Sequence, residues 1–170
     1  MTSERQGATH SSRVQAAKSL SGTVLAVCVS QGGIPKHPVE SARVAETGVE
    51  GDKQRYAFHG GPDRAVCLFS IEDYRKLERD GVRAEAPGAY GENLLTEGLD
   101  YDELRAGDRL QVGDDILLEI YDVREPCTTL KSIDARFPNL MIGRSGFVCR
   151  VLRGGVARGG LEIRKLASAC

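Results

Sequence analysis

The cysteine at position 127 has the setting that points most directly to chemistry. It lies in "VREPCTTL" (123–130), where an apolar stretch ends in an arginine, an acid and a proline. Pro126 fixes φ and has no amide proton, so it takes the next residue out of a strand's hydrogen-bonding ladder. A cysteine ligates a metal or attacks sulfur only as the thiolate, a form that Arg124 could favour. Cys127 is therefore the candidate metal ligand or sulfur nucleophile, and the alternative is an inert core cysteine.

The remaining cysteines of the sequence stand in settings that packing alone explains. Cys28, Cys67 and Cys149 lie in apolar, β-branched segments, which predicts that they pack in the core. Cys170 is the last residue, and we expect it to be exposed. No C-x-x-C pair occurs, so neither a structural zinc site nor a disulfide framework is indicated. Free thiols of this kind are typical of a reducing compartment.

Two glycine-rich stretches, 48–70 and 142–155, place polar side chains beside exposed backbone amides. In "HGGPDR" a glycine pair separates His59 from a proline, an acid and Arg64. Successive backbone N–H groups in such loops carry partial positive charge and suit an anionic or highly polar ligand. The alternative is that these glycines only form the corners of a small barrel.

Three acidic residues near these loops are expected to be structural. Asp52 and Asp63 are placed to cap turns, and Glu92 of "GENL" is placed to hold a loop closed by hydrogen bonds. For the neighbouring Asn93, both a structural role and a contact with the ligand stay open.

The composition indicates one globular domain without a nucleic-acid or membrane partner. The chain has 170 residues and a net charge of −1, whereas nucleic-acid binders usually carry a clear basic excess. No apolar run approaches the ~18 residues of a membrane span. Residues 1–20 are polar and lack the apolar stretch of a secretory signal, which predicts a disordered tail and a cytoplasmic protein.

The elements that must position these residues are mostly short strands. Residues 70–81, "SIEDYRKLERDG", form the clearest helix, with Ser70 as N-cap, Asp73 three residues on and Gly81 as the stop. A tight hairpin is predicted through Gly113 and Asp114. Alternating or continuous apolar residues predict strands at 22–30, 41–45, 64–70, 106–114, 115–123, 146–155 and 161–166.

This pattern predicts a mainly β fold, a closed or partly open β-barrel with a few short helices, over residues 21–167. Strands do not alternate with long helices, which argues against a doubly wound fold. The G-x-G-x-x-G, P-loop and H-E-x-x-H motifs are missing, so dinucleotide-binding, P-loop and zinc-protease functions have no support.

The ordered set of motifs resembles the MOSC family, named after the C-terminal part of molybdenum cofactor sulfurase, and most closely its stand-alone bacterial YiiM-like branch. The resemblance covers about residues 22–166, and its motifs are "GVEGD", "HGGPDRAV", "GENL", "GDRL", "REPC" and "RVLRGG". It implies a barrel of the pyruvate-kinase-barrel-like type that binds a molybdenum–pterin cofactor. It places the family's key cysteine on Cys127, and it also carries a general family association with pyridoxal phosphate binding.

The resemblance implies a role for each candidate residue. Cys127 would ligate molybdenum, and His59 would donate a proton or, alternatively, only anchor a loop. The cofactor's phosphate and pterin need donors and close backbone approach, for which the candidates are Gly60, Gly61, Arg64, Asn93, Arg124, Arg144 and Arg150. The sequence departs from the family at Thr129, because relatives often have lysine there; here Lys131 lies two residues further on.

The implied function is the reduction of N-hydroxylated bases or related N-oxygenated small molecules. The chain has no flavin, haem or iron–sulfur motif, so an external reductase would supply the electrons. The alternative is a sulfur carrier or cofactor-binding module that holds a persulfide on Cys127. Both functions use the same thiolate, so the sequence leaves them open.

Overall fold

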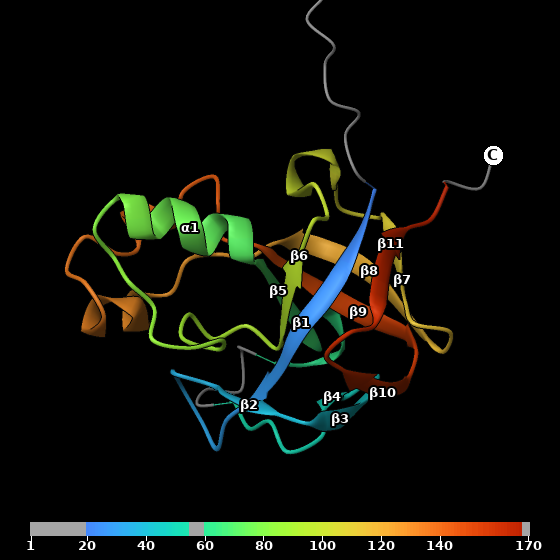
Figure 1. The fold of residues 1–170 in the computed structure, drawn as a ribbon. Coiled ribbons are helices and arrows are strands. Elements are labelled where there is room, and N and C mark those ends of the chain that lie inside the picture. Colours follow the sequence, from blue (N-terminus) through green and yellow to red (C-terminus); the bar gives the residue numbers. More distant parts are fainter. Residues whose placement is uncertain (1–19, 55–59, 168–170) are drawn as a thin grey trace, which may run out of the picture.

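A closed β-barrel forms the body of the molecule (Figure 1). The computed structural model describes residues 20–54 and 60–167. In this described part, strands follow one another around the barrel in the order β1-β11-β7-β8-β9-β5-β6, and β6 pairs again with β1. The β5–β6 pair is parallel and the other pairs are antiparallel. The barrel strands are β1 (Ser21–Val29), β5 (Val66–Ser70), β6 (Leu94–Glu97), β7 (Arg109–Val112), β8 (Ile116–Val123), β9 (Phe147–Arg153) and β11 (Glu162–Lys165).

Alternating side chains fill the barrel interior. On β8, Ile116, Leu118 and Ile120 are buried and belong to the interior core, while the residues between them are partly exposed. β8 pairs with β7 through the hairpin expected at Gly113 and Asp114, with Val112 opposite Ile116. Each fully buried Leu or Ile contributes about 1.5–3 kcal/mol to folding, so this apolar face fixes the strand register.

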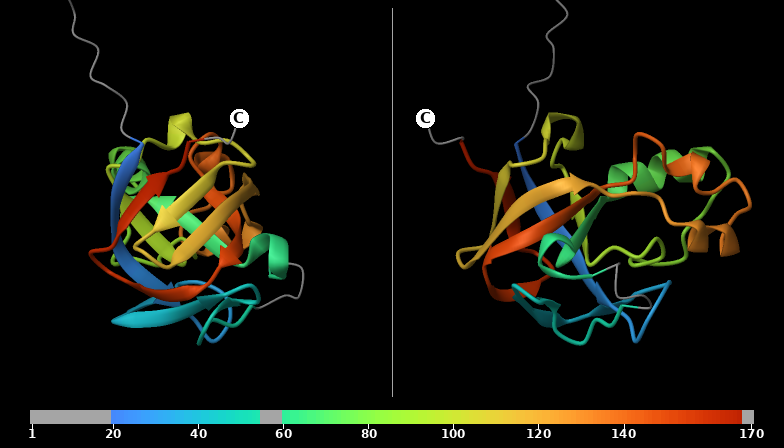
Figure 2. Two further views of the ribbon diagram at one scale, coloured as in Figure 1. Left: turned by 90° about the vertical axis from the view of Figure 1, so that its right-hand side faces the viewer. Right: turned by 180° about the vertical axis from the view of Figure 1, so that it is seen from behind.

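A small sheet covers one end of the barrel (Figure 2). It has the order β10-β3-β4, and β2 joins the edge of the barrel sheet by pairing with β1. The prediction of a strand at 41–45 is confirmed, and it belongs to this small sheet. These strands are β2 (His37–Val39), β3 (Ser41–Ala45), β4 (Gly48–Val49) and β10 (Gly155–Arg158).

One α-helix, α1 (Ile71–Arg79), follows β5 directly within the described part of the chain. It begins as predicted, since the Ser70 side chain accepts a hydrogen bond of 3.1 Å from the backbone N–H of Asp73. Side chains of its inner face and of the segment after Cys127 form a second core with β5 and β6. Figure 2 shows that both segments lie on the same side of the barrel. The short 3-10 helices are η2 (Pro62–Arg64), η3 (Tyr101–Glu103), η4 (Thr128–Ser132) and η5 (Asn139–Met141).

The predicted fold class, a mainly β barrel with a few short helices, is confirmed. Among the described residues, no helix is long and apolar enough to cross a membrane. The predicted tail at 1–20 lies outside the described residues except for Leu20. His59 and Cys170 also lie outside them. The extent of the domain, 21–167, stays a prediction.

Candidate functional site

A pocket of about 110 Å³ lies where the segment after β8 meets the outer face of β5 and β9. It brings together four of the residues that the sequence singled out, namely Arg64, Asn93, Arg124 and Cys127. These residues come from segments far apart in the chain, so the closed barrel is what assembles the pocket.

Cys67 also lines this pocket, so the prediction that it packs in the core is wrong. Its neighbours Val66 and Leu68 point into the barrel and are fully buried, and alternation along the strand therefore turns Cys67 outward. Burial raises the pKa of the Cys67 thiol, and the nearby Arg124 guanidinium partly offsets that rise. The pocket thus holds two thiols.

Two further cysteines, Cys28 and Cys149, are confirmed as core residues. Cys28 and Cys149 are fully buried. Burial raises the pKa of Cys28 to about 12 and raises that of Cys149 as well. Both thiols are therefore kept protonated and are poorly suited to act as ligands.

Cys127 occupies the position just before η4, with extended backbone angles. A residue at such a position often caps the helix with its side chain, but the Cys127 sulfur makes no capping bond. Instead it accepts a hydrogen bond of 3.1 Å from the hydroxyl of Thr129. Both side chains are partly exposed and line the pocket, so the sulfur is accessible to a ligand.

Arg124 is the most unusual polar group of the pocket. It is only 9% exposed, and its Nη2 donates a hydrogen bond to the backbone carbonyl of Tyr90. Its Nη1 is buried and has no hydrogen-bond partner among the described residues, and the same is true of Nε of Arg64. An unpaired buried donor costs about 1–3 kcal/mol, so such groups are rare in native proteins. Two arginines that line one pocket and each keep an unpaired buried donor suit an anion-binding site.

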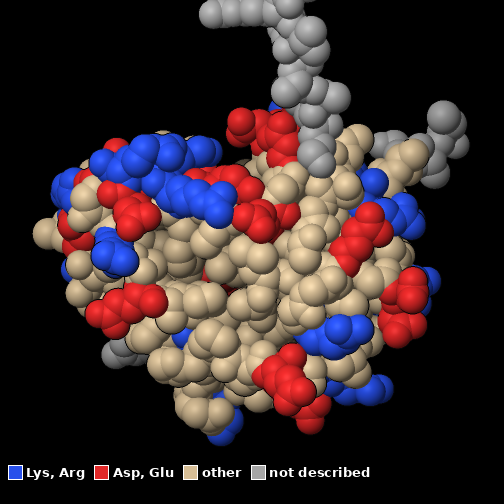
Figure 3. Space-filling view, in the orientation of Figure 1, with Lys and Arg blue, Asp and Glu red and all other residues tan. Residues whose placement is uncertain are grey.

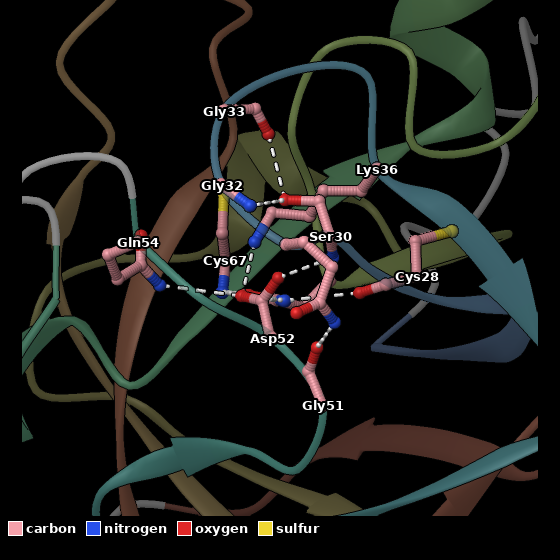
Figure 4. A network of polar contacts seen from close by, with 11 residues as sticks. Cys28, Ser30, Gly32, Gly33, Lys36, Gly51, Asp52, Gln54 and Cys67 are labelled. Atoms are coloured by element: carbon pink, nitrogen blue, oxygen red, sulfur yellow. Dashed lines mark hydrogen bonds and ion pairs between the residues drawn. The ribbon is translucent and has the colours of Figure 1, made fainter.

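A buried polar network forms one wall of the pocket (Figure 4). Asp52 accepts hydrogen bonds from the Lys36 ammonium, from Nδ2 of Asn93 at 2.9 Å and from the backbone N–H of Ser30 at 2.8 Å. The Asn93 Oδ1 accepts from the backbone N–H of Cys67 at 3.0 Å. The network therefore joins the segment after β1 to the strand that carries Cys67.

Lys36 and the central position of Asp52 were not found from the sequence. Lys36 lies near prolines in a segment that looks exposed, yet it is 7% exposed and lines the pocket. Its partner Asp52 neutralises it, which leaves the other lining cations available to a ligand. The charged residues that line the pocket are Lys36, Lys53, Arg64, Arg124 and Glu125, an excess of positive charge.

Arg144 and Arg150 lie outside this pocket. Arg144 forms an ion pair with Asp80 and lines a separate hollow of about 910 Å³ beside the start of α1. Arg150 pairs with Asp63 at 2.7 Å and with Glu119 at 3.3 Å. Their roles as cofactor ligands have no geometric support from the described residues.

The glycine pair of "HGGPDR" supports the pocket indirectly. Gly61 has φ of 96°, which favours glycine, and it begins the η2 turn that carries Arg64. The Gly61 carbonyl accepts a hydrogen bond of 3.0 Å from the backbone N–H of Arg64. Gly60 packs against Gln54, a pocket residue, while His59 lies outside the described residues.

Glu92 has the structural role that was expected. It is fully buried and accepts hydrogen bonds from the Tyr74 hydroxyl and, at 2.7 Å, from the backbone N–H of Gly88. Burial raises its pKa, since these bonds only partly offset the loss of water. The side chain closes the segment before β6 against α1.

Lysine and arginine side chains also gather over α1, as Figure 3 shows. Arg75 pairs with Glu97 at 3.0 Å and Lys76 pairs with Asp73 at 2.7 Å. The Arg75–Glu97 pair is exposed and worth about 0–1 kcal/mol, whereas Asp73 is buried; neither pair shares a residue with the pocket around Cys127.

The sequence matches the MOSC domain model over residues 55–164. A protein of Gibberella moniliformis named Reductase is 37% identical over 122 residues, which are 64% of this chain and 21% of that protein. The uncharacterized protein YflK of Bacillus subtilis is 33% identical over 141 residues, 79% of this chain and 63% of that protein. The crystal structure of YiiM from Geobacillus stearothermophilus is 25% identical and superposes with a TM-score of 0.71, covering 86% of this chain and 75% of that one. The chain thus spans less than two thirds of either curated relative.

Proposed function

Since this chain belongs to the MOSC domain family and is similar to its YiiM members, we propose that it binds a molybdenum–pterin cofactor through Cys127 and reduces N-hydroxylated bases or related compounds. The observation that carries the proposal is the unpaired, buried Nη1 of Arg124 in the pocket that also exposes the Cys127 sulfur. A soft thiolate beside unpaired cationic donors suits a ligand that has both a soft metal and an anionic group.

The pocket fits one end of such a cofactor. Its volume of about 110 Å³ is well below the ~300–1,000 Å³ of typical small-molecule sites. In this proposal only the compact, charged end enters the pocket. Arg64 and Arg124 would donate hydrogen bonds to anionic oxygens of the end that enters, and Asn93 would hold the wall in place through Asp52.

In the proposed reaction, R–NHOH takes up two electrons and two protons to give R–NH₂ and water. The cofactor, when bound, supplies the centre that accepts the oxygen. Cys127 holds it, and the guanidinium groups of Arg64 and Arg124 fix its orientation by hydrogen bonds. His59 stays the proposed proton donor. Electrons come from an external reductase, and the reducing environment of the cytoplasm would keep the Cys127 thiol available.

Activity of the loaded protein tests this function. The protein is produced together with the cofactor-synthesis enzymes and given a reduced viologen and an N-hydroxylated nucleobase. We expect the amine product from the unaltered protein and from Thr128→Ala, an exposed neighbour that does not line the pocket. We expect none from Cys127→Ala. Equal product from Cys127→Ala would show that the thiol is not required.

A sulfur carrier is the second candidate function, and the small pocket volume favours it. A pocket of about 110 Å³ accommodates one added sulfur atom on Cys127 without the rest of a cofactor. Intact-mass measurement after incubation with a persulfide donor tests this alternative. A reducible gain of one sulfur mass on Cys127, in protein without amine-forming activity, would favour the carrier over the reductase.

A further inference from the structure

Arg64 enters the pocket from η2, a short turn with few contacts of its own to hold it in place. None of the three η2 residues is buried, and no side chain caps the turn. The hydrogen bond of 3.0 Å from the Arg64 N–H to the Gly61 carbonyl closes the turn but does not join it to the barrel. Apart from its covalent link to β5, the turn therefore depends on contacts with other elements for its position.

One ion pair supplies such a contact. Asp63, which precedes Arg64 in η2, accepts a hydrogen bond of 2.7 Å from Nε of Arg150. The sequence predicted that Asp63 caps a turn, but its bond goes instead to β9, 87 residues further along the chain. Among the described residues, this is the only side-chain hydrogen bond recorded between η2 and the rest of the protein. The Asp63–Arg150 pair therefore joins η2 to the barrel.

The Arg150 guanidinium is itself held by two groups on β8. Arg150 stands opposite Glu119 in the pairing of β8 with β9, and its Nη1 donates to the Glu119 carboxylate at 3.3 Å. The guanidinium carbon lies 4.7 Å from the centre of the Tyr121 ring, which is a cation–π contact. A planar guanidinium can bond to two carboxylates while it stacks on a ring, a combination that the single ammonium of a lysine does not offer. Arg150 is thus anchored on the sheet, and η2 is anchored on Arg150.

We propose that Arg150 is a positioning residue for the pocket: through Asp63 it holds η2 against the barrel and so sets the place of the Arg64 guanidinium. Arg150 does not line the pocket, so this role is indirect and replaces the interpretation of Arg150 as a direct cofactor ligand. The purpose of the arrangement rests on the proposed function, since Arg64 has a ligand to bind only if the pocket takes an anion.

Hydrogen exchange tests whether the pair holds η2, and it needs no ligand. Arg150→Met and Asp63→Ala each break the pair from one side. Because exposed ion pairs are weak, we expect amide exchange in residues 60–66, followed by peptide mass spectrometry, to become about two- to fivefold faster at an unchanged Tm. Arg153→Met is the matched control, since Arg153 lies on the same strand but bonds to β7 and to the turn after it, not to η2.

Phosphate binding tests the consequence for Arg64. Asp63→Ala removes a negative charge beside Arg64, so electrostatics alone predicts that this variant binds inorganic phosphate more tightly. Loss of the Asp63–Arg150 pair predicts the opposite, a Kd about two- to fivefold higher by isothermal titration calorimetry at constant ionic strength. In an Arg64→Met background, where no guanidinium is left to position, Asp63→Ala should no longer raise the Kd.

Two results overturn the proposal. One is amide exchange in residues 60–66 that is as slow in both Arg150→Met and Asp63→Ala as in the unaltered protein, because the pair would then not hold η2. The other is an Asp63→Ala protein that binds phosphate as tightly as the unaltered protein or more tightly, because η2 would then not set the place of Arg64. The exchange result stands even if the unaltered protein forms no amine, so failure of the proposed function is told apart from failure of this proposal.

Discussion

Replacement of Arg124 by methionine separates anion binding from stability. The side chain gains one hydrogen bond, to the Tyr90 carbonyl, and leaves Nη1 buried and unpaired. A hydrogen bond from a charged donor contributes about 1.5–3 kcal/mol, and an unpaired buried donor costs about 1–3 kcal/mol. The two nearly cancel, so we expect the free energy of unfolding of Arg124→Met to change by less than about 1 kcal/mol without a ligand.

The same substitution should abolish the response to an anion. At a phosphate concentration ten times its Kd, binding to the native state stabilises the protein by RT ln 11, about 1.4 kcal/mol. For a domain of this size this raises Tm by about 3–6 °C. Arg124→Met should show no such rise, whereas Arg75→Met, which breaks only an exposed pair with Glu97, should keep it.

Differential scanning fluorimetry with a phosphate titration at constant ionic strength measures both effects. A full phosphate response in Arg124→Met would refute the assignment of the anion site to this guanidinium. A loss of several kcal/mol without phosphate would show that Nη1 has a stabilising partner. An unaltered protein that does not respond to phosphate would contradict the assignment of an anion site to this pocket.

Four further substitutions test the fold and its pH dependence. Burial raises the pKa of Glu92, so the folded state binds more protons than the unfolded state, and the free energy of unfolding should fall as pH rises from the ordinary pKa of 4.5 toward the raised one. Glu92→Gln should flatten the plot of unfolding free energy, measured in urea, against pH between pH 4.5 and 8. An unchanged slope of that plot would contradict this. Cys28→Ser should lower the free energy of unfolding in urea by about 1–3 kcal/mol because it buries a hydroxyl. Cys67→Ser, at the pocket wall, should lower it by less, and equal losses of stability would contradict the outward direction of Cys67. Leu118→Ala should cost about 2–5 kcal/mol, since Leu118 is fully buried in the barrel, and a loss below 1 kcal/mol would argue against that packing.

Local patterns were sufficient to predict most elements. Ser70 and Asp73 determine where α1 begins through one hydrogen bond between residues three apart, so the helix start is visible in the sequence. The hairpin at Gly113 and Asp114 is local in the same way. The proline before Cys127 marked that cysteine correctly as one outside regular strand pairing.

The wall of the pocket depends on contacts that the sequence does not display. Asp52 was expected to cap a turn, yet its main partners are Lys36 and Asn93, which are 16 and 41 residues away in the chain. Cys67 lies between the apolar residues Val66 and Leu68, so the sequence does not display the alternation that turns it outward. Arg150 pairs with Glu119 because the register of β8 and β9 places the two residues opposite each other.

The most direct test of the central claim is the molybdenum content of protein produced in a host that makes the cofactor. Elemental analysis should find close to one molybdenum per chain in the unaltered protein and in Thr128→Ala, and a background level in Cys127→Ala that still unfolds at the same temperature. Molybdenum retained at full level by a folded Cys127→Ala protein would contradict the claim that this sulfur is the ligand.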